Sequence, residues 1–325
     1  MQSVEEFRKN FDNVYYNRLL NIITSFEEDR KKALLKAIIC LICGIILGFL
    51  IPQIYKYCDL FLMNTFSNLS SDTRSDLLGY IIAVPVLIVA GLLITPSIIA
   101  KDFENTVKKK VMPTLLNALP KFKWSSKKCI TDNFIYNARL FGDYNRQSGD
   151  DNFSGKYKNV DVKMWETELG KETGSGKNRT YTVRFKGVLV ALEPPRQYKG
   201  LTLIKKDNLI DITPQGLEQV NLEDVEFEKD YNVYSDDQIE ARYVLTTAFM
   251  ERFKNIKLAF NASKIEASIS EQGILIAIST GRDLFKVGKL WRPVADYEQF
   301  KTMADEFASI LELIDTLKLE QNIGM

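Results

Sequence analysis

The chain has 325 residues, and its 43 Lys and Arg residues nearly balance its 42 Asp and Glu residues, giving a formal net charge of +1 at pH 7. This balance argues against a protein that binds nucleic acid. The sequence has no histidine, which removes the usual general base, the Ser-His and Cys-His nucleophile pairs and the H-E-x-x-H zinc site. We predict no catalytic, cofactor-binding or metal-binding residues.

The N-terminal segment has the pattern of an amphipathic helix. Residues 3–32 place apolar side chains at helical spacing, behind a capping box that runs from Ser3 to Glu6. The first two turns are rich in Glu and Asp, which disfavours a helix that lies on an anionic bilayer. We predict that residues 1–32 form a cytoplasmic helix that packs against the rest of the protein and continues into the membrane.

Two uncharged apolar runs follow, Ala37–Tyr55 and Gly79–Ala100. Each is about as long as the roughly 20 residues that a bilayer-spanning helix needs. A buried helix of a soluble protein would show a polar stripe, which both runs lack. We predict a transmembrane helical hairpin over residues 33–100 with a short outer loop. The first run is expected to stay in the mature protein, because residues 1–36 precede it.

Lys and Arg residues are concentrated on one side of both runs. The connecting segment 56–78 has only Lys56 and Arg74, whereas the outer flanks of the two runs carry Arg30, Lys31, Lys32, Lys36, Lys101, Lys108, Lys109 and Lys110. By the positive-inside rule both termini face the cytoplasm of a multi-pass protein. No Asp, Glu, Lys or Arg lies within either run to mark an ion path, so two such helices make a poor transporter unless several copies assemble.

The segment after the second run, residues 101–124, is basic and ends in aromatic residues. Its lysines lie where contact with anionic lipid headgroups is expected, so we name Lys108, Lys109, Lys110 and Trp124 as candidate headgroup contacts. The simpler interpretation is a plain topology signal, since lysines next to a span are expected on the cytoplasmic side in any case.

The stretch GKETGSGKNRT, Gly170 to Thr180, resembles a phosphate-binding loop but departs from that consensus. With Gly176 and Lys177 as the Gly-Lys pair, the first glycine position holds Lys171 and the hydroxyl position holds Asn178. The flanking segments 160–169 and 181–192 alternate apolar and polar residues, which is typical of strands. We predict a β-hairpin with a flexible tip and no nucleotide site.

Residues 125–325 have the mixed pattern of an α+β domain. Strands are predicted over Ile135–Tyr144 and Gly200–Asn208. A helix is predicted over Ser235–Leu245, with Ser235 as the N-cap, and a second helix from Thr246 or Thr247. Around the first helix we name four candidate contacts for a partner: Tyr234, Asp236, Asp237 and Arg242. Each of them also has a simple capping or packing explanation.

The C-terminal part is predicted to contain a hairpin and a long helix. Lys264–Ser270 and Gly273–Ser279 alternate around a Glu-Gln-Gly turn. The apolar residues from Phe300 to Leu317 recur at steps of three and four. Because this seam covers fewer than three heptads, we expect the helix to pack on the sheet or on the N-terminal helix in preference to forming a coiled coil.

Several segments together resemble a known family. Two apolar helices near the N-terminus precede the segments FKGVLVALEPPRQYKGLTLI, LEQVNLEDVEFEKDYNVYSDDQIEARYVLTTAFMERF and IEASISEQGILIAIS. This arrangement resembles the bacterial membrane proteins grouped as domain-of-unknown-function family 3137, most specifically over Phe227–Phe253. The resemblance implies a bacterial inner-membrane location and a cytoplasmic α+β domain, and it brings no activity or catalytic residues with it.

The sequence as a whole predicts an α+β fold: a transmembrane hairpin, then a cytoplasmic domain of antiparallel strands with a helix pair and a C-terminal amphipathic helix. We expect a membrane-tethered, non-enzymatic interaction or scaffold module whose partner is a protein or a lipid. Two alternatives stay open. One is a carboxylate and metal-dependent enzyme that uses Glu166, Asp236, Asp237 and Glu240, and the other is a homo-oligomeric channel or transport accessory protein.

Overall fold

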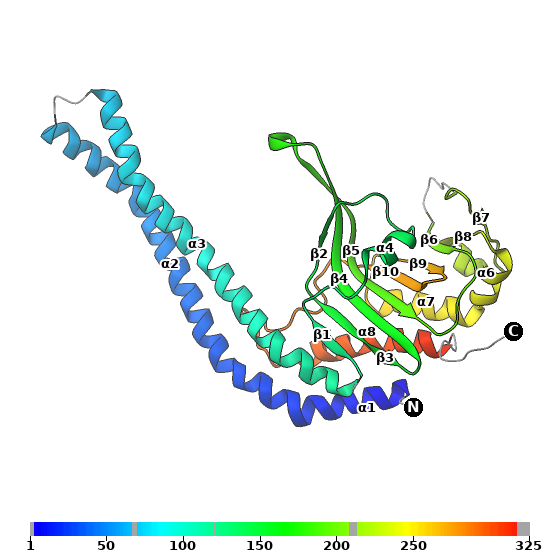
Figure 1. Cartoon of the computed structure of the whole chain (residues 1–325). Helices are drawn as coiled ribbons and strands as arrows, with labels where there is room; N and C mark the ends of the chain where they lie inside the picture. Colours follow the sequence, from blue (N-terminus) through cyan, green and yellow to red (C-terminus); the bar gives the residue numbers. More distant parts are fainter. Residues whose placement is uncertain (1–2, 67–69, 120, 208–212, 317–325) are drawn as a thin grey trace. The chain divides into compact units, whose positions relative to one another are not determined.

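The computed structural model describes residues 3–66, 70–119, 121–207 and 213–316 (Figure 1). Two long apolar helices come first, and an antiparallel sheet with a C-terminal helix follows, which confirms the predicted α+β class. By their contacts the described residues form two compact units. The hairpin unit lies within residues 20–111 and 286–295, and the sheet unit lies within residues 1–19, 112–285 and 296–325.

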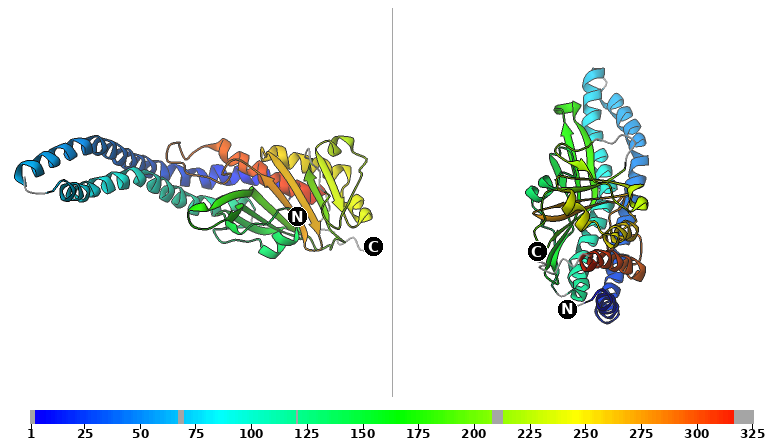
Figure 2. Two further views of the ribbon diagram at one scale, coloured as in Figure 1. Left: turned by 90° about the horizontal axis from the view of Figure 1, so that it is seen from above. Right: turned by 90° about the vertical axis from the view of Figure 1, so that its right-hand side faces the viewer.

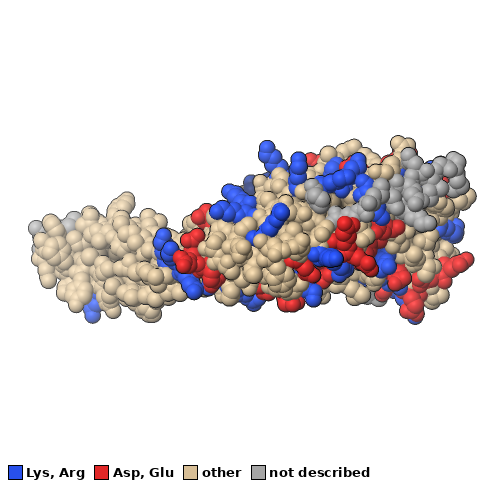
Figure 3. All heavy atoms as spheres, turned by 90° about the horizontal axis from the view of Figure 1, so that it is seen from below, with Lys and Arg blue, Asp and Glu red and all other residues tan. Residues whose placement is uncertain are grey.

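The hairpin unit is built from α2 (Leu20–Thr65) and most of α3 (Ser71–Leu115). Only 11% of the residues in the most apolar stretch of the first helix and 6% of those in the second are buried. Figure 3 shows the matching surface, at its left, almost without Lys, Arg, Asp or Glu atoms. The core helices of soluble proteins are mostly buried, whereas the apolar stretches of these two helices are mostly exposed. Both are long and apolar enough to cross a membrane.

A glycine sets how closely α2 and α3 approach. A Cβ atom at Gly44 would lie 3.1 Å from the Leu93 Cδ2 atom and 3.3 Å from the Leu92 Cβ atom. Small residues at such a crossing let two apolar helices pack backbone against backbone.

The sheet unit contains ten strands in one antiparallel sheet. Their order is β1-β3-β4-β5-β10-β9-β6-β8-β7, and β2 pairs with β4. The strands are β1 (Lys123–Ser125), β2 (Arg146–Ser148), β3 (Asn152–Tyr157), β4 (Val160–Thr173), β5 (Thr180–Glu193), β6 (Thr202–Lys206), β7 (Glu218–Gln219), β8 (Tyr231–Ser235), β9 (Lys264–Ser270) and β10 (Gly273–Ser279).

The predicted hairpins and the strand at residues 200–208 are confirmed, with Asn208 itself outside the described residues. β4 and β5 pair from Asp161↔Glu193 to Thr173↔Thr180, and β9 and β10 pair through the turn before Gly273. The tip of the first hairpin contains a short 3-10 turn, Gly176–Asn178, and no helix follows it. The structure therefore gives no helix N-terminus where a phosphate would need one.

Two helices, α7 (Thr247–Ala259) and α8 (Tyr297–Thr316), lie on one face of the sheet, and α1 (Val4–Val14) packs on α8 (Figure 2). A phenylalanine cluster joins α8 to this face. The ring centroid of Phe153 on β3 lies 4.6 Å from that of Phe285 and 5.1 Å from that of Phe307 on α8. All three rings are buried, so they anchor the C-terminal helix on the sheet.

The opposite face of the sheet is covered by residues 129–144. Successive residues of a strand point to opposite faces, so Trp165 and Leu189 face away from Met164 and Val190. They pack in a second buried cluster with Ile135, Ala138 and Leu140. The sheet is thus buried on both faces over most of its width.

The N-terminal helix packs as predicted. The Ser3 side chain accepts a hydrogen bond from Glu6 N, and the Glu6 side chain accepts one from Ser3 N, which completes the capping box. A π-helical turn, Tyr15–Leu19, links α1 to α2. The Tyr297 hydroxyl donates to Asp12 Oδ1 at 2.8 Å, so α1 lies on α8.

The C-terminal seam is buried against α1, α7 and the sheet, as the short heptad pattern predicts. Its buried members are Phe300, Met303, Phe307, Ile310 and Ile314, and Leu317 lies outside the described residues.

One predicted strand is wrong. Ile135–Tyr144 contains the end of a short helix, α4 (Asp132–Asn137), followed by irregular chain in which Arg139 has a left-handed φ of 52°. The Thr131 side chain caps this helix by accepting from Phe134 N. The apolar spacing from Ile135 to Ala138 fits a helical turn as well as a strand, and the cap decides between them.

One predicted helix starts later than expected. Ser235 is the last residue of β8, where its hydroxyl lies 2.9 Å from that of Thr202. The N-cap of α6 (Gln238–Val244) is Asp237, whose Oδ1 accepts from Ile239 N and Glu240 N. Pairing of β8 with β6 therefore extends the strand through the predicted cap position. The next helix, α7, begins with Thr246 as its N-cap, as predicted.

Candidate functional site

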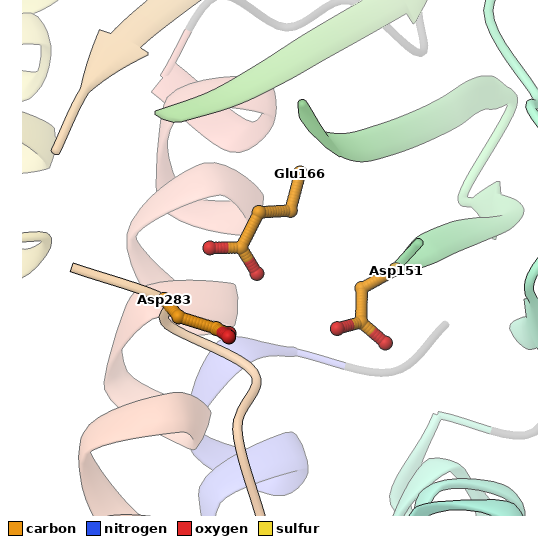
Figure 4. Close-up of side chains that lie close together, drawn as sticks. All are labelled: Asp151, Glu166 and Asp283. Atoms are coloured by element: carbon orange, nitrogen blue, oxygen red, sulfur yellow. The ribbon is translucent and has the colours of Figure 1, made fainter. Parts of the chain in front are cut away.

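The structure brings three carboxylates together that lie far apart in the sequence (Figure 4). Glu166 lies on β4, Asp151 is the residue immediately before β3, and Asp283 lies in the segment after β10. One oxygen of each lies within 4.8 Å of the others. Antiparallel pairing of β3 and β4 sets the first two side by side, and Glu166 N donates to Asp151 O at 2.9 Å.

Each of the two inner carboxylates accepts hydrogen bonds from the protein. Glu166 Oε1 accepts from Leu284 N at 2.8 Å, and its Oε2 accepts from Phe285 N at 3.4 Å. Asp151 is fully buried, and its Oδ1 accepts from Trp124 Nε1 at 2.7 Å. These bonds join β4 to the segment that follows β10, and they add a side-chain hydrogen bond to the backbone pairing of β1 with β3.

Burial changes the acidity of this region. Desolvation raises the pKa of Glu166 to about 8, and the nearby Asp283 and Asp151 add to the rise, while the hydrogen bond from Leu284 opposes it. Desolvation likewise raises the pKa of Glu306 on α8 to about 8, against the opposing effect of Arg282. Arg282 Nη2 donates to Glu306 Oε1 at 3.3 Å. Burial therefore favours the protonated form of both glutamates.

The three carboxylates have the composition of a hard-cation site. Ca²⁺ takes oxygen ligands at about 2.3 to 2.6 Å, so the spacing of Asp151, Glu166 and Asp283 admits one ion on distance alone. The contacts of Glu166 and Asp151 also have a purely structural result, because they fix the segment that leaves β10. We assign the cluster this structural role.

The carboxylates that the sequence suggested for an enzyme are not brought together. Glu166 lies on β4, and Asp236, Asp237 and Glu240 follow β8, which is five places away in the sheet. At about 4.8 Å per strand this is roughly 24 Å. Glu240 instead pairs with Arg196 at 2.7 Å. The four residues do not form one metal centre.

The four predicted partner contacts have structural roles. Tyr234 is 1% exposed and belongs to the buried cluster on the sheet face that α8 does not cover. Asp236 Oδ1 accepts from Leu201 N at 2.7 Å, and Asp237 caps α6. Arg242 is exposed and donates to Gln238 O at 3.3 Å. It lines an open hollow of about 690 Å³ between α5 (Val225–Glu228) and the start of α7.

The predicted headgroup contacts differ in exposure. Lys108 is 4% exposed, whereas Lys109 and Lys110 are exposed. The Lys110 ammonium lies 5.4 Å from the centroid of the Phe26 ring. Trp124 is half-buried and uses its indole N–H for Asp151. Contact of these residues with lipid stays a prediction, and Lys109 and Lys110 are the two that are most accessible for it.

The second feature of interest is the outer part of the β4–β5 hairpin, residues 170–186, which we call the arm (Figure 1). β10 pairs with β5 only from Gly187 onward, and β2 pairs with β4 only at residues 168–170. Among the described residues, no strand pairs with the outer edge of β5 from Thr180 to Phe185. Tyr181 and Val183 are 47% and 49% exposed.

Side chains hold the arm in a fixed form. The phenol ring of Tyr181 covers Gly170 so closely that a Cβ atom at Gly170 would overlap the ring. The pairing of β4 with β5 shifts its register at this point, between Leu169 and Gly170. The Tyr181 hydroxyl donates to Glu168 Oε1 at 2.8 Å. Glu172 pairs with both Arg146 and Arg179. The sequence predicts the hairpin. It does not predict that the outer part of the hairpin extends beyond the sheet, because this depends on where β10 stops pairing with β5.

Comparison with known proteins agrees with the resemblance that the sequence indicates. Residues 183–319 match the family described as "Protein of unknown function (DUF3137)". No curated protein matches the chain. Among solved structures the chain is similar to the crystal structure of the mycobacterial trehalose monomycolate transport factor A, TtfA, with a TM-score of 0.32 and 10% sequence identity, over 63% of this chain and 91% of that chain. A likeness of this size assigns no function.

Proposed function

We propose that this chain is a membrane-tethered interaction module without enzymatic activity. In this proposal α2 and α3 anchor it in a bacterial inner membrane, both termini lie in the cytoplasm, and the sheet unit binds a protein partner there. The exposed apolar surface of the hairpin supports the anchor, since soluble monomers rarely expose apolar patches of that extent. The cationic flanks support the orientation. We keep the predicted division into residues 1–32, 33–100, 101–124 and 125–325.

The observation that carries the binding role is the arm. A ribbon of two strands is at best marginally stable in water, so its projection adds little to the stability of the sheet unit. Its β5 edge offers unpaired backbone N–H and C=O groups from Thr180 to Phe185. Such an edge binds an extended peptide as a further strand, with main-chain hydrogen bonds giving affinity and side chains giving specificity.

The arm is prepared for such binding by its internal contacts. The ion pairs of Glu172 and the packing of Tyr181 on Gly170 order the ribbon before a partner arrives. Ordering in advance lowers the entropic cost of association. We therefore propose an extended segment of a protein as the partner, added along β5 next to Tyr181 and Val183.

Site-specific photocrosslinking in intact cells tests this proposal. A photoreactive amino acid at Val183 is expected to capture a defined protein, and the same group at Leu258, which is exposed on α7 away from the arm, is expected not to capture it. Replacing Glu172–Tyr181 by Asn-Gly closes the hairpin with a tight two-residue turn and is expected to abolish the crosslink.

Three outcomes separate the alternatives. Identical products at Val183 and Leu258 would refute the arm as the contact. Capture of a second copy of this chain would favour the homo-oligomeric channel or transport accessory alternative. Release of the protein from membranes by alkaline carbonate would refute the anchor.

A further inference from the structure

The segment Lys286–Ala295, here called the return loop, comes after β10 in the sequence but belongs to the hairpin unit. Figure 2 shows it, in brown, beside α2 and α3. Arg30 Nη1 donates to Leu290 O at 2.9 Å, and Lys286 Nζ lies 3.2 Å from Glu104 Oε2. The return loop is thereby fixed to both helices.

Apolar contacts fix it further. Val287, Leu290 and Val294 are buried. Gly288 has a φ of +75°, and a Cβ there would lie 2.7 Å from Val107 Cβ on α3. Gly288 is required on both counts, because larger residues rarely adopt this backbone conformation and would not fit against the helix.

Three side chains of the return loop, Lys289, Trp291 and Arg292, are exposed. Trp291 is 59% exposed, and it lies between Lys289 and Arg292, which are exposed too. Within the described part of the chain, these three side chains make no hydrogen bond or ion pair. An exposed indole between two cations has the composition of a membrane-interface contact, where the ring enters the boundary layer and the cations meet anionic headgroups.

The return loop contacts both helices at the same level. Arg30 lies seven residues before Ala37, where the first apolar run begins, and Val107 lies seven residues after Ala100, where the second ends. At 1.5 Å per residue both points are about 10 Å from the apolar runs. The headgroup layer extends about 5 to 8 Å beyond the hydrocarbon core, which is within the reach of long side chains at this level.

The charge around the return loop fits an anionic surface. The exposed lysines at this end of the same unit, Lys31, Lys32, Lys36, Lys101, Lys109 and Lys110, together with Lys289 and Arg292, outnumber its exposed acidic residues there, Glu28, Asp29 and Asp102. Basic side chains next to a span are attracted to an anionic leaflet within a Debye length of its surface.

We propose that Lys289, Trp291 and Arg292 contact the anionic phospholipid surface of the leaflet nearest this end of the hairpin. The return loop is then a third membrane contact, in addition to α2 and α3. It is formed by residues that come after β10, the last strand in the sequence. This inference rests on the proposed anchoring by α2 and α3, and it adds that the membrane also holds residues 286–295.

The test uses full-length protein in vesicles that contain a phospholipid brominated near the headgroup end of its acyl chains, with and without phosphatidylglycerol. Bromine quenches nearby tryptophan emission. The chain has three tryptophans, of which Trp165 is buried. We expect quenching in the wild type, its loss in Trp291→Phe and its retention in Trp124→Phe. In the double variant Lys289→Gln with Arg292→Gln, we expect quenching to lose its dependence on phosphatidylglycerol.

Flotation of the same samples after carbonate treatment separates the two proposals. Protein that floats with vesicles while Trp291→Phe is quenched like the wild type overturns the return-loop contact and leaves the anchor intact. Protein that does not float overturns both. Wild-type protein that floats but is unquenched in vesicles, while a photoreactive amino acid at position 291 captures a defined protein in cells, would show a protein partner at Trp291 and would likewise overturn the lipid contact.

Discussion

Glu166 on β4 accepts a 2.8 Å hydrogen bond from the backbone N–H of Leu284, 118 residues later in the chain. The next residue, Phe285, donates to the other oxygen of the same carboxylate and packs on Phe153. Phe285 is also the last residue of the sheet unit before the return loop. One glutamate therefore fixes the point at which the chain leaves the sheet.

The raised pKa values of Glu166 and Glu306 predict that stability falls as pH rises. Below about pH 4.5 both groups are protonated in the folded and the unfolded chain. Between about pH 4.5 and pH 8 the unfolded chain loses these protons while the folded chain keeps them, so the free energy of unfolding decreases and then levels off. A rise of the pKa from 4.5 to about 8 corresponds to about 5 kcal/mol per group at most.

Thermal unfolding of detergent-solubilised protein at pH 5 and pH 9 measures this loss. Glu306→Gln removes one of the two titrating groups from a site that is 2% exposed, while it keeps an oxygen for Arg282. We expect its Tm to fall less between the two pH values than that of the wild type. An equal fall in both proteins would contradict the prediction.

The close approach of the two long helices predicts different results at two glycines. Gly44→Ile places a branched side chain against Leu92 and Leu93, and we expect a loss of about 1 to 3 kcal/mol in stability. At Gly91 an added Cβ meets no atom within 4 Å, so Gly91→Ile serves as the matched control. Unfolding in detergent compares the two variants, and equal stabilities would argue against helix packing at Gly44.

The observed cap of α6 predicts that the hydrogen-bond acceptor oxygen of Asp237 contributes more to stability than its negative charge does. Asp237→Ala removes the acceptor for Ile239 N and Glu240 N and is expected to cost about 1 kcal/mol. Asp237→Asn keeps an acceptor oxygen and is expected to cost little. Hydrogen exchange of the Ile239 and Glu240 amides measures the effect, and equal protection in both variants would count against this cap.

The arm predicts a protease phenotype. Tyr181→Ala removes the ring that covers Gly170 and the hydrogen bond to Glu168, so the ribbon is expected to open more often. Trypsin is then expected to cleave at Lys171 and Arg179 several-fold faster than in the wild type. Val183→Ala, on the same strand and similarly exposed, is the control, and equal cleavage rates in the two variants would show that Tyr181 does not order the arm.

Much of the fold could be predicted because its strongest elements carry regular patterns. The alternation in Lys264–Ser270 and Gly273–Ser279 and the apolar seam from Phe300 each identify an element without knowledge of its neighbours. Short elements do not contain enough residues for a regular pattern to identify them. Ile135–Tyr144 has apolar residues that suit either a strand or a helical turn, and the side chain of Thr131 is what selects the turn.

The candidate site could not be predicted, because it depends on tertiary pairing. Asp151 and Asp283 have no recognisable metal-ligand spacing to Glu166 in the sequence, and only the pairing of β3 with β4 and the path after β10 bring them to that residue. In the sequence the return loop shows only a tryptophan between two cations after a glycine, and its exposure becomes visible only in the structure. Nothing local shows that it belongs with helices of which the second ends at Leu115, about 170 residues earlier.

The return loop also has a consequence for biosynthesis. At about 5 to 20 residues per second, the ribosome needs roughly 10 to 40 s to travel from the end of the hairpin to Ala295. During that time the nascent hairpin is without the backbone acceptor of Arg30 and the glycine that covers Val107. A messenger truncated before Lys286 would therefore yield the two long apolar helices without the return-loop contacts of Arg30 and Val107, a product that cellular proteases are expected to recognise.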